Sequence, residues 1–216
     1  METKTENTQT LQRSNVELAN ALTHFLGALL AIPAGWFIIS RGFAINNITG
    51  ISMLIFALGI FILYFSSGLY HWTVAPRAKY ILRHFDHANI YVLIAASYTP
   101  IWLCTVGGSF GTIFSIIIWS LAIIGIVTEL FTLGKYPKLS LALYLLMGWS
   151  VVFVIKPIWE NLNQTQLIFL LFEGLSYTIG TYFYAHKEKP HFHVIWHIFV
   201  LGGTIFHYLV VLPIVL

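Results

Sequence analysis

The last apolar stretch of the chain carries histidines at a spacing that suits metal binding. In HVIWHIFVLGGTIFHY, residues 193–208, His193 and His197 are four residues apart, and His207 follows ten residues later. In a helix, side chains at i and i+4 lie on one face, about 5–6 Å apart at Cβ. His193 and His197 can therefore meet one metal ion. His207 would lie about 15 Å further along the helix and needs another partner.

Two other stretches supply residues that would complete such a site. SSGLYHW, residues 66–72, contains His71 with Ser67 one turn earlier, and RHFDHANIY, residues 83–91, contains Asp86. Three imidazoles and an open fourth position are the pattern of a catalytic zinc site. In that case Asp86 could hold a water molecule or accept its proton, and Ser67 could donate a hydrogen bond to developing negative charge.

Composition places these residues in a membrane protein. Of the 216 residues, 58% are hydrophobic and 9% are charged, whereas a soluble domain has about 25% charged residues. A spanning helix needs about 20 mostly apolar residues, so we predict an all-α, polytopic membrane protein that forms a bundle of seven transmembrane helices. The predicted spans are residues 18–40, 50–71, 87–106, 111–133, 139–157, 166–186 and 192–214.

The charged residues between the spans predict the orientation of the chain. With seven spans, nine of the eleven Lys and Arg residues fall on one side, and Arg41 and Lys156 fall on the other. Because positively charged joints face the cytoplasm, we expect a cytoplasmic N-terminus and a C-terminus outside. This topology places the span ends that carry His71, Asp86 and His193 at one level near the cytoplasmic face.

The polar N-terminus, the single cysteine and the net charge indicate how the chain is organised. Residues 1–16 are predicted to be a polar cytoplasmic tail, and residues 17–216 a single seven-helix domain. We expect no cleavable signal peptide, because the first apolar run is too long for one. Cys104 is the single cysteine, which excludes an intrachain disulfide, and the net charge of +3 is too small to indicate nucleic acid.

Other interpretations of the polar residues remain open. A histidine in an apolar helix often bonds a backbone carbonyl, and an aspartate near a helix start is favoured by the helix dipole. His24, in LTHFLG, is interpreted as a residue that packs or supports the site, not as a ligand. Glu173 lies at a depth that matches His207 and is its predicted partner, whereas Glu129 is expected to be reached by water or by Lys135.

Three stretches resemble the hemolysin III branch of the progestin and adipoQ receptor family, which is related to the alkaline ceramidases. They are NALTHFLGALLAIP, SSGLYHW…RHFDHANIYVLIAASYTP and HFHVIWHIFVLGGTIFHY, and the resemblance extends from about residue 17 to the C-terminus. It implies a seven-helix fold with a zinc ion on the cytoplasmic side. The matching positions are His71, His193 and His197 for zinc, Asp86 for contact with the water on zinc, and Ser67.

The resemblance also implies a class of substrate. Receptor members cleave, or are proposed to cleave, lipid amides such as ceramide, and the bacterial members are named for haemolytic activity. The branch is also linked to membrane fluidity or energetics. The Asp86–His87 pair stands where the receptors have aspartate–tyrosine, as expected of the bacterial branch. The receptors' long N-terminal extension is missing, so hormone recognition is not implied.

We therefore expect a multi-pass protein of the inner (plasma) membrane with a zinc cofactor and membrane lipids as partners. The expected activity is hydrolysis of a lipid amide or ester that enters laterally from the bilayer. Asp86 would act as general base and later as proton donor to the leaving amine. The alternatives are a non-enzymatic sensor or regulator of membrane state with structural zinc, or a cytolysin that permeabilises membranes. Nothing in the sequence indicates a nucleic acid, a protein partner or an oligomeric state.

Overall fold

The computed structural model describes the backbone of residues 2–132 and 135–216, and within those ranges the side chains from residue 15 onward except that of Pro137. Seven helices in this part of the chain are long and apolar enough to cross a membrane, which confirms the all-α, seven-helix prediction. The α-helices are α1 (Glu2–Ile45), α2 (Asn47–Trp72), α3 (Pro76–Pro100), α4 (Gly108–Thr132), α5 (Pro137–Gly148), α6 (Ile155–Asn161), α7 (Gln164–Ala185) and α8 (Phe192–Val211).

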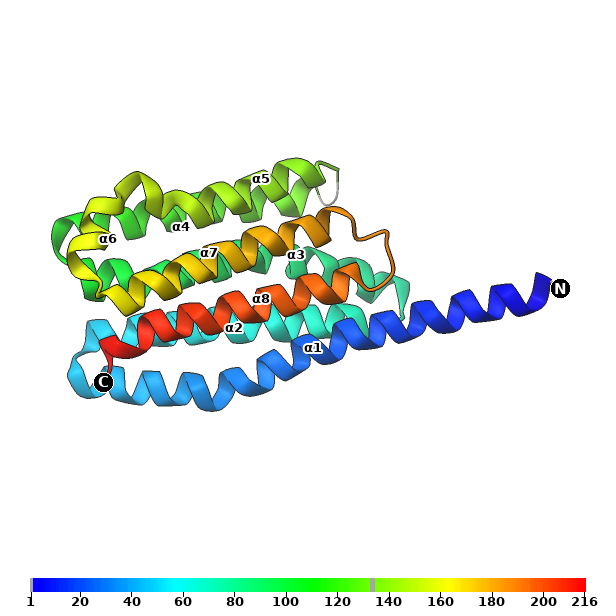
Figure 1. Ribbon diagram of the computed structural model, residues 1–216, viewed down its shortest axis with the longest axis horizontal. Helices are drawn as coiled ribbons and strands as arrows, with labels where there is room; N and C mark the ends of the chain where they lie inside the picture. The colour runs from blue at the N-terminus through cyan, green and yellow to red at the C-terminus, as the bar shows by residue number, and fades with distance from the viewer. Residues whose placement is uncertain (1, 133–134) are drawn as a thin grey trace.

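The long helices lie side by side, and the joints between them alternate between the two ends of the bundle (Figure 1). Neighbours in sequence pack together in the pairs α1–α2, α2–α3, α3–α4 and α7–α8, and α8 also packs against α1. At one end, which we call the histidine end, α2 ends at Trp72, α3 begins at Pro76 and α8 begins at Phe192. Segments more than 100 residues apart in sequence therefore meet at the histidine end.

The start of α3 differs from the sequence prediction. The third span was predicted to begin at residue 87, but α3 begins at Pro76. Proline suits the first turn of a helix, because its missing N–H would have no partner there in any case. Asp86 consequently lies ten residues inside α3, and the interpretation of Asp86 as a charge favoured by the dipole of a helix start is wrong.

The span predicted at residues 139–157 is not one regular helix. α5 is followed by a 3₁₀ segment, Trp149–Val154, and then by the short helix α6. Pro157 lies in α6 and cannot donate a backbone hydrogen bond toward the preceding turn. The predicted polar tail also ends inside an element, because residue 16 lies in α1. The side chains of residues 1–14 lie outside the described ones, so the division at residue 16 stays a prediction.

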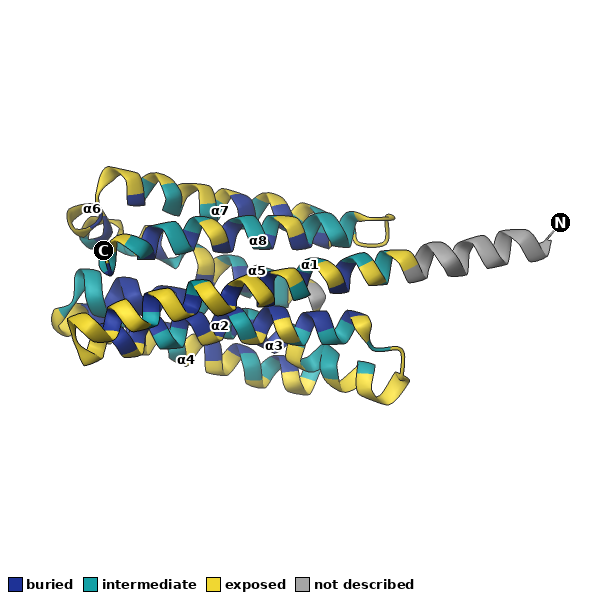
Figure 2. Cartoon of the chain, turned by 90° about the horizontal axis from the view of Figure 1, so that it is seen from below, coloured by how far each residue is buried: buried dark blue, intermediate teal, exposed yellow. Residues whose placement is uncertain are grey.

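Two apolar clusters fill the bundle. One joins α3, the π-helical segment Ile101–Val106, α4 and α5, and includes the buried Trp102 and Met147. The other joins α1, α2 and α8 and includes Phe56 and Val200. The outward faces of the helices carry many exposed leucine, isoleucine and phenylalanine side chains, visible as the yellow outer surfaces in Figure 2. Helices with apolar outward faces and internally bonded backbones are what a lipid solvent requires.

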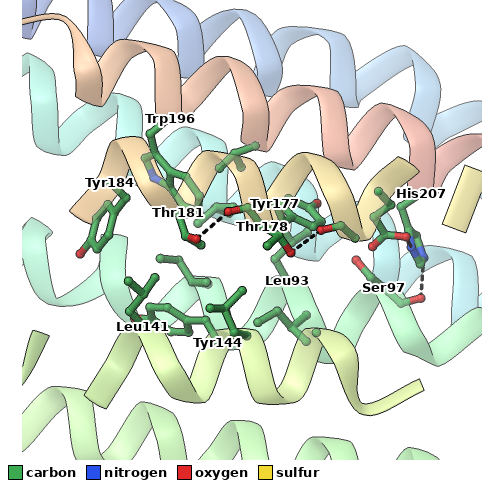
Figure 3. A pocket seen from close by; sticks show the side chains of 18 of the residues that line it. Leu93, Ser97, Leu141, Tyr144, Tyr177, Thr178, Thr181, Tyr184, Trp196 and His207 are labelled. Carbon is green, nitrogen blue, oxygen red and sulfur yellow. Dashed lines mark hydrogen bonds and ion pairs between the residues drawn. The ribbon is translucent and has the colours of Figure 1, made fainter. Parts of the chain in front are cut away.

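A cavity of about 120 Å³ borders both clusters. Side chains of α3, α5, α7 and α8 surround it, including Leu93, Leu141, Tyr184 and Trp196 (Figure 3). It extends from Tyr184 at the histidine end to His207, deep in the bundle. This cavity connects several of the polar residues that the sequence analysis singled out, namely Ser67, Asp86, His193, His197, Glu173 and His207.

Candidate metal centre

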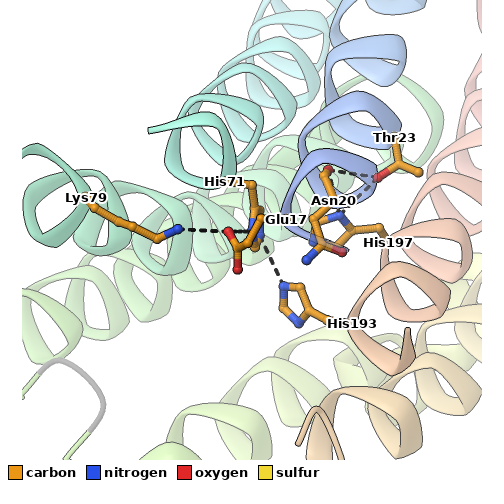
Figure 4. Close-up of polar contacts among 7 residues, drawn as sticks. All are labelled: Glu17, Asn20, Thr23, His71, Lys79, His193 and His197. Carbon is orange, nitrogen blue, oxygen red and sulfur yellow. Dashed lines mark hydrogen bonds and ion pairs between the residues drawn. The ribbon is translucent and has the colours of Figure 1, made fainter. Parts of the chain in front are cut away.

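The three histidines predicted as metal ligands come together at the histidine end. His71 lies on α2, and His193 and His197 lie on α8. Each offers one ring nitrogen, and the three nitrogens all lie within 4.8 Å of one another. The Nε2 atoms of His71 and His193 are 3.2 Å apart, as the facing rings in Figure 4 show. The structure thus forms a group that could hold a metal ion, from residues 122 positions apart in the chain.

The spacing of one pair in the group, and the imidazole chemistry of all three members, match the ligands that zinc takes. Zinc binds imidazole nitrogen at about 2.0–2.1 Å in tetrahedral geometry, which separates two ligand nitrogens by about 3.3 Å. The observed 3.2 Å between the Nε2 atoms of His71 and His193 matches this value. His71 is 5% exposed and His197 is 1% exposed. At this distance one Nε2 can donate to the other when no metal is bound, and a cation between the two rings would bind the lone pairs of both.

Residues of α1 orient His71. A Glu17 carboxylate oxygen lies 3.2 Å from Nδ1 of His71 and also accepts a 2.8 Å hydrogen bond from the Lys79 ammonium (Figure 4). A carboxylate at Nδ1 favours the tautomer with a proton on that nitrogen, which leaves Nε2 free to bind a metal. Carboxylate–histidine pairs of this kind are typical of the surroundings of protein metal sites.

His197 is oriented by the same helix. Its Nδ1 lies 3.2 Å from the backbone oxygen of Asn20 and 3.2 Å from the hydroxyl of Thr23. Because a carbonyl oxygen only accepts, Nδ1 carries the proton and Nε2 keeps its lone pair. His24 stacks on His197, with ring centroids 3.5 Å apart and planes inclined by 14°. This stacking agrees with the interpretation of His24 as a residue that packs against the site.

The sequence analysis did not identify Glu17, Asn20 or Thr23. A signal was present, because Glu17, Asn20 and His24 are spaced i, i+3 and i+7 and therefore share one face of α1. A carboxylate at the start of a predicted span is also a candidate functional residue in its own right. This face of α1 packs on α2 and α8, the two helices that carry the candidate ligands.

Asp86 and Ser67, predicted to act beside the metal, both line the cavity together with His193 and His197. The antiparallel register of α2 and α3 explains their placement. The Asn89 side-chain amide donates to the Ser66 hydroxyl at 2.9 Å, so Asp86 lies level with the turn that follows Ser67. The Ser67 hydroxyl is buried and has no hydrogen-bond partner among the described residues. His71 is not among the residues that line the cavity.

The deep end of the cavity is closed by a polar pair. His207 Nδ1 lies 2.7 Å from a Glu173 carboxylate oxygen, and Nε2 donates to the backbone oxygen of Ser97 at 2.8 Å. The predicted pairing of Glu173 with His207 is confirmed. The prediction for Glu129 is wrong. Glu129 is 1% exposed and bonds His87 at 2.9 Å, so neither water nor Lys135 reaches it.

Basic side chains surround the histidine end outside the spans. The Lys187 ammonium lies over the Tyr184 ring, 4.6 Å from its centroid. The pKa of Lys187 is lowered from its ordinary value, mainly by desolvation and to a smaller extent by repulsion from Arg83.

Comparison with known proteins shows the family of the chain. A model of a family described as "Haemolysin-III related" matches residues 12–208. The chain is 42% identical over 191 residues to the hemolysin-3 homolog of Bacillus subtilis (strain 168), covering 87% of this chain and 89% of that protein. It is 38% identical over 189 residues to hemolysin-3 of Bacillus cereus, covering 87% of this chain and 86% of that protein. It is 31% identical over 202 residues to the human monocyte to macrophage differentiation factor, covering 88% of this chain and 80% of that protein. The chain belongs to the haemolysin-III related family.

Proposed function

We propose that the protein is a zinc-dependent hydrolase that cleaves a lipid amide or ester. One observation carries this proposal: two members of the histidine group, His193 and His197, line one cavity together with Asp86 and Ser67, and its other walls are largely apolar. Its apolar lining includes Leu93, Ile94 and Val200. A polar end beside the candidate metal and an apolar length toward the bundle interior would suit a substrate with a polar head and a hydrocarbon chain.

Each polar residue has a role in this proposal. His71, His193 and His197 would hold zinc, which supplies a Lewis acid that polarises a carbonyl and acidifies water. Asp86 takes the proton of the attacking water. Ser67, whose hydroxyl lacks a partner among the described residues, donates a hydrogen bond to the oxygen that becomes negative as the water adds.

We also propose that the N-terminus and the histidine end face the cytoplasm, and that the membrane is the plasma membrane. The uneven distribution of Lys and Arg over the joints supports this orientation. The substrate enters laterally, because a hydrocarbon chain needs an apolar path between helices. Cysteine labelling tests the orientation, since a reagent that cannot cross the membrane should label the joint after Ile45 and not the joint after Ala185 in intact cells.

The substitution Asp86→Asn tests the hydrolase proposal. It removes the base but keeps the size of the side chain, and Asp86 is not in the histidine group. The purified variant should keep its zinc and should lose turnover of lipid amides and esters by about 10²–10⁴-fold, as expected for loss of a general base. Turnover of the variant at the wild-type rate would refute the proposed role of Asp86.

A second candidate function is a non-enzymatic regulator of membrane state with structural zinc. The distribution of the site over three helices favours this function. The candidate ligands lie on α2 and α8, and the hydrogen-bond partners of His71 and His197 lie on α1. Zinc would then stabilise the packing of α1, α2 and α8. Removal of zinc should lower the thermal stability under both proposals. The two proposals differ in activity. Only the hydrolase proposal predicts that the protein releases fatty acid from lipid, and that the Asp86→Asn variant loses this activity.

A further inference from the structure

A second cluster of ionisable side chains adjoins the cavity outside the candidate metal group. Glu129 on α4 is 1% exposed and His87 on α3 is 9% exposed. One Glu129 carboxylate oxygen accepts from Nδ1 of His87 at 2.9 Å, and the other accepts from the Ser140 hydroxyl at 2.7 Å. The carboxylate thus has a donor on each oxygen, which is the arrangement that keeps a buried carboxylate ionised.

The sequence places Glu129 opposite His87 through a close approach of α3 and α4. Gly125 faces the ring of Tyr91, and a Cβ at that glycine would lie only 2.4 Å from a ring carbon. Gly125 and Glu129 are one turn apart on α4, and His87 and Tyr91 are one turn apart on α3. Since the helices run antiparallel (Figure 1), the contact at Gly125 sets the register that brings Glu129 to His87.

Glu129 leaves one ring nitrogen of His87 available to the cavity. Nδ1 is engaged by the carboxylate, and Nε2 has no hydrogen-bond partner in the described part of the chain. The backbone at His87 is also held, because the Tyr144 hydroxyl donates to its carbonyl oxygen at 3.1 Å. His87 lines the cavity together with Asp86, His193 and Tyr144. An imidazole oriented by a buried carboxylate and open at its other nitrogen is the arrangement of a general acid–base.

We propose that His87, oriented by Glu129, is the proton donor to the leaving group of the hydrolysis proposed above, on which this inference rests. Water adds its oxygen to the carbonyl carbon and passes one proton to Asp86. The bond from carbon to nitrogen, or to oxygen in an ester, then breaks, and the leaving atom takes the Nε2 proton of His87. The proton that Asp86 took from water then passes to Nε2 of His87, which restores both residues. One water is consumed, and one acid and one amine or alcohol are released.

This division of roles assigns the base and the acid to adjacent residues. Asp86 accepts a proton from the water, and His87 donates a proton to the leaving group. The positive charge on a doubly protonated His87 is compensated by the Glu129 carboxylate, so the pair is neutral while it holds the proton. Glu129 acts through His87 and is a positioning residue.

The test compares two substrates with the same acyl chain and different leaving groups, of which only one needs a proton donor. An N-alkyl amide of a long-chain fatty acid must receive a proton on its leaving nitrogen, whereas the 4-nitrophenyl ester of the same acid releases a stable anion. The variants are Glu129→Gln and His87→Gln. The matched control is His84→Gln, on the same helix, where the ring donates to the Tyr80 backbone oxygen. Zinc content and thermal unfolding are measured for every variant.

We expect amide turnover to fall by about 100-fold or more in both variants, the loss of a general acid, while ester turnover stays within about threefold of wild type. Zinc content and the control should be unchanged. Equal loss on both substrates, no loss on either, or loss of zinc in both variants would overturn the role of His87 and leave the hydrolase proposal standing. A zinc-loaded wild type that cleaves neither substrate would overturn the hydrolase proposal itself and this role with it.

Discussion

The substitution Glu17→Gln should weaken zinc binding without touching a ligand. Gln keeps the size of the side chain but removes the charge that favours a proton on Nδ1 of His71, 3.2 Å away. Loss of such partners weakens metal binding by about 10–100-fold. The Glu17 side chain is 38% exposed and is shared with Lys79, so water competes for it. We therefore expect the lower part of that range, about 10-fold, or about 1.4 kcal/mol.

Zinc competition in detergent solution measures this effect. The purified protein competes with a chromophoric chelator of known affinity, and Kd follows from the titration. The control is Glu160→Gln, because Glu160 is exposed and pairs with Lys156 at 3.8 Å, far from His71 in the sequence. A Kd for Glu17→Gln equal to that of wild type would show that the carboxylate does not support the site. An equal weakening in the control would show that the effect is not specific to His71.

Three further predictions concern stability. Glu173→Gln should lower the free energy of unfolding by about 1–3 kcal/mol, because it leaves His207 imperfectly paired in the bundle; an unchanged unfolding midpoint would contradict this. Gly125→Ala should cost about 1–3 kcal/mol through overpacking against Tyr91, and a thermal shift assay in detergent that finds no loss would show that α4 can move away freely. Removing zinc with a chelator should lower the unfolding midpoint reversibly, since a ligand at about 1,000 times its Kd stabilises by about 4 kcal/mol; a midpoint independent of zinc would count against a site in the folded protein.

The long apolar segments made the helix count predictable, because lipid tolerates few backbone structures. The meeting of His71 with His193 was also predictable, since alternate joints of an antiparallel bundle share one end. The matched depths of Glu173 and His207 predicted their contact in the same way. These inferences needed only the lengths and order of the helices.

Features set by helix rotation and close packing were not predictable from hydropathy. The amphipathic start of α3 at Pro76 looks like a polar joint, because apolar content falls there although the helix continues. Glu129 looked solvent-accessible from its position near a helix end, yet the glycine contact one turn earlier brings it against His87. Glu17 was missed because its role depends on which face of α1 meets α2.

The zinc content of the purified protein tests the central claim most directly. Protein expressed with zinc in the medium is analysed by mass spectrometry of the metal, as wild type, His197→Ala and His186→Ala. His186 bonds the Tyr182 backbone oxygen and lies outside the histidine group. We predict about one zinc per chain in wild type and in His186→Ala, and almost none in His197→Ala. Wild type without zinc, or equal zinc in all three proteins, would contradict a metal centre formed by His71, His193 and His197.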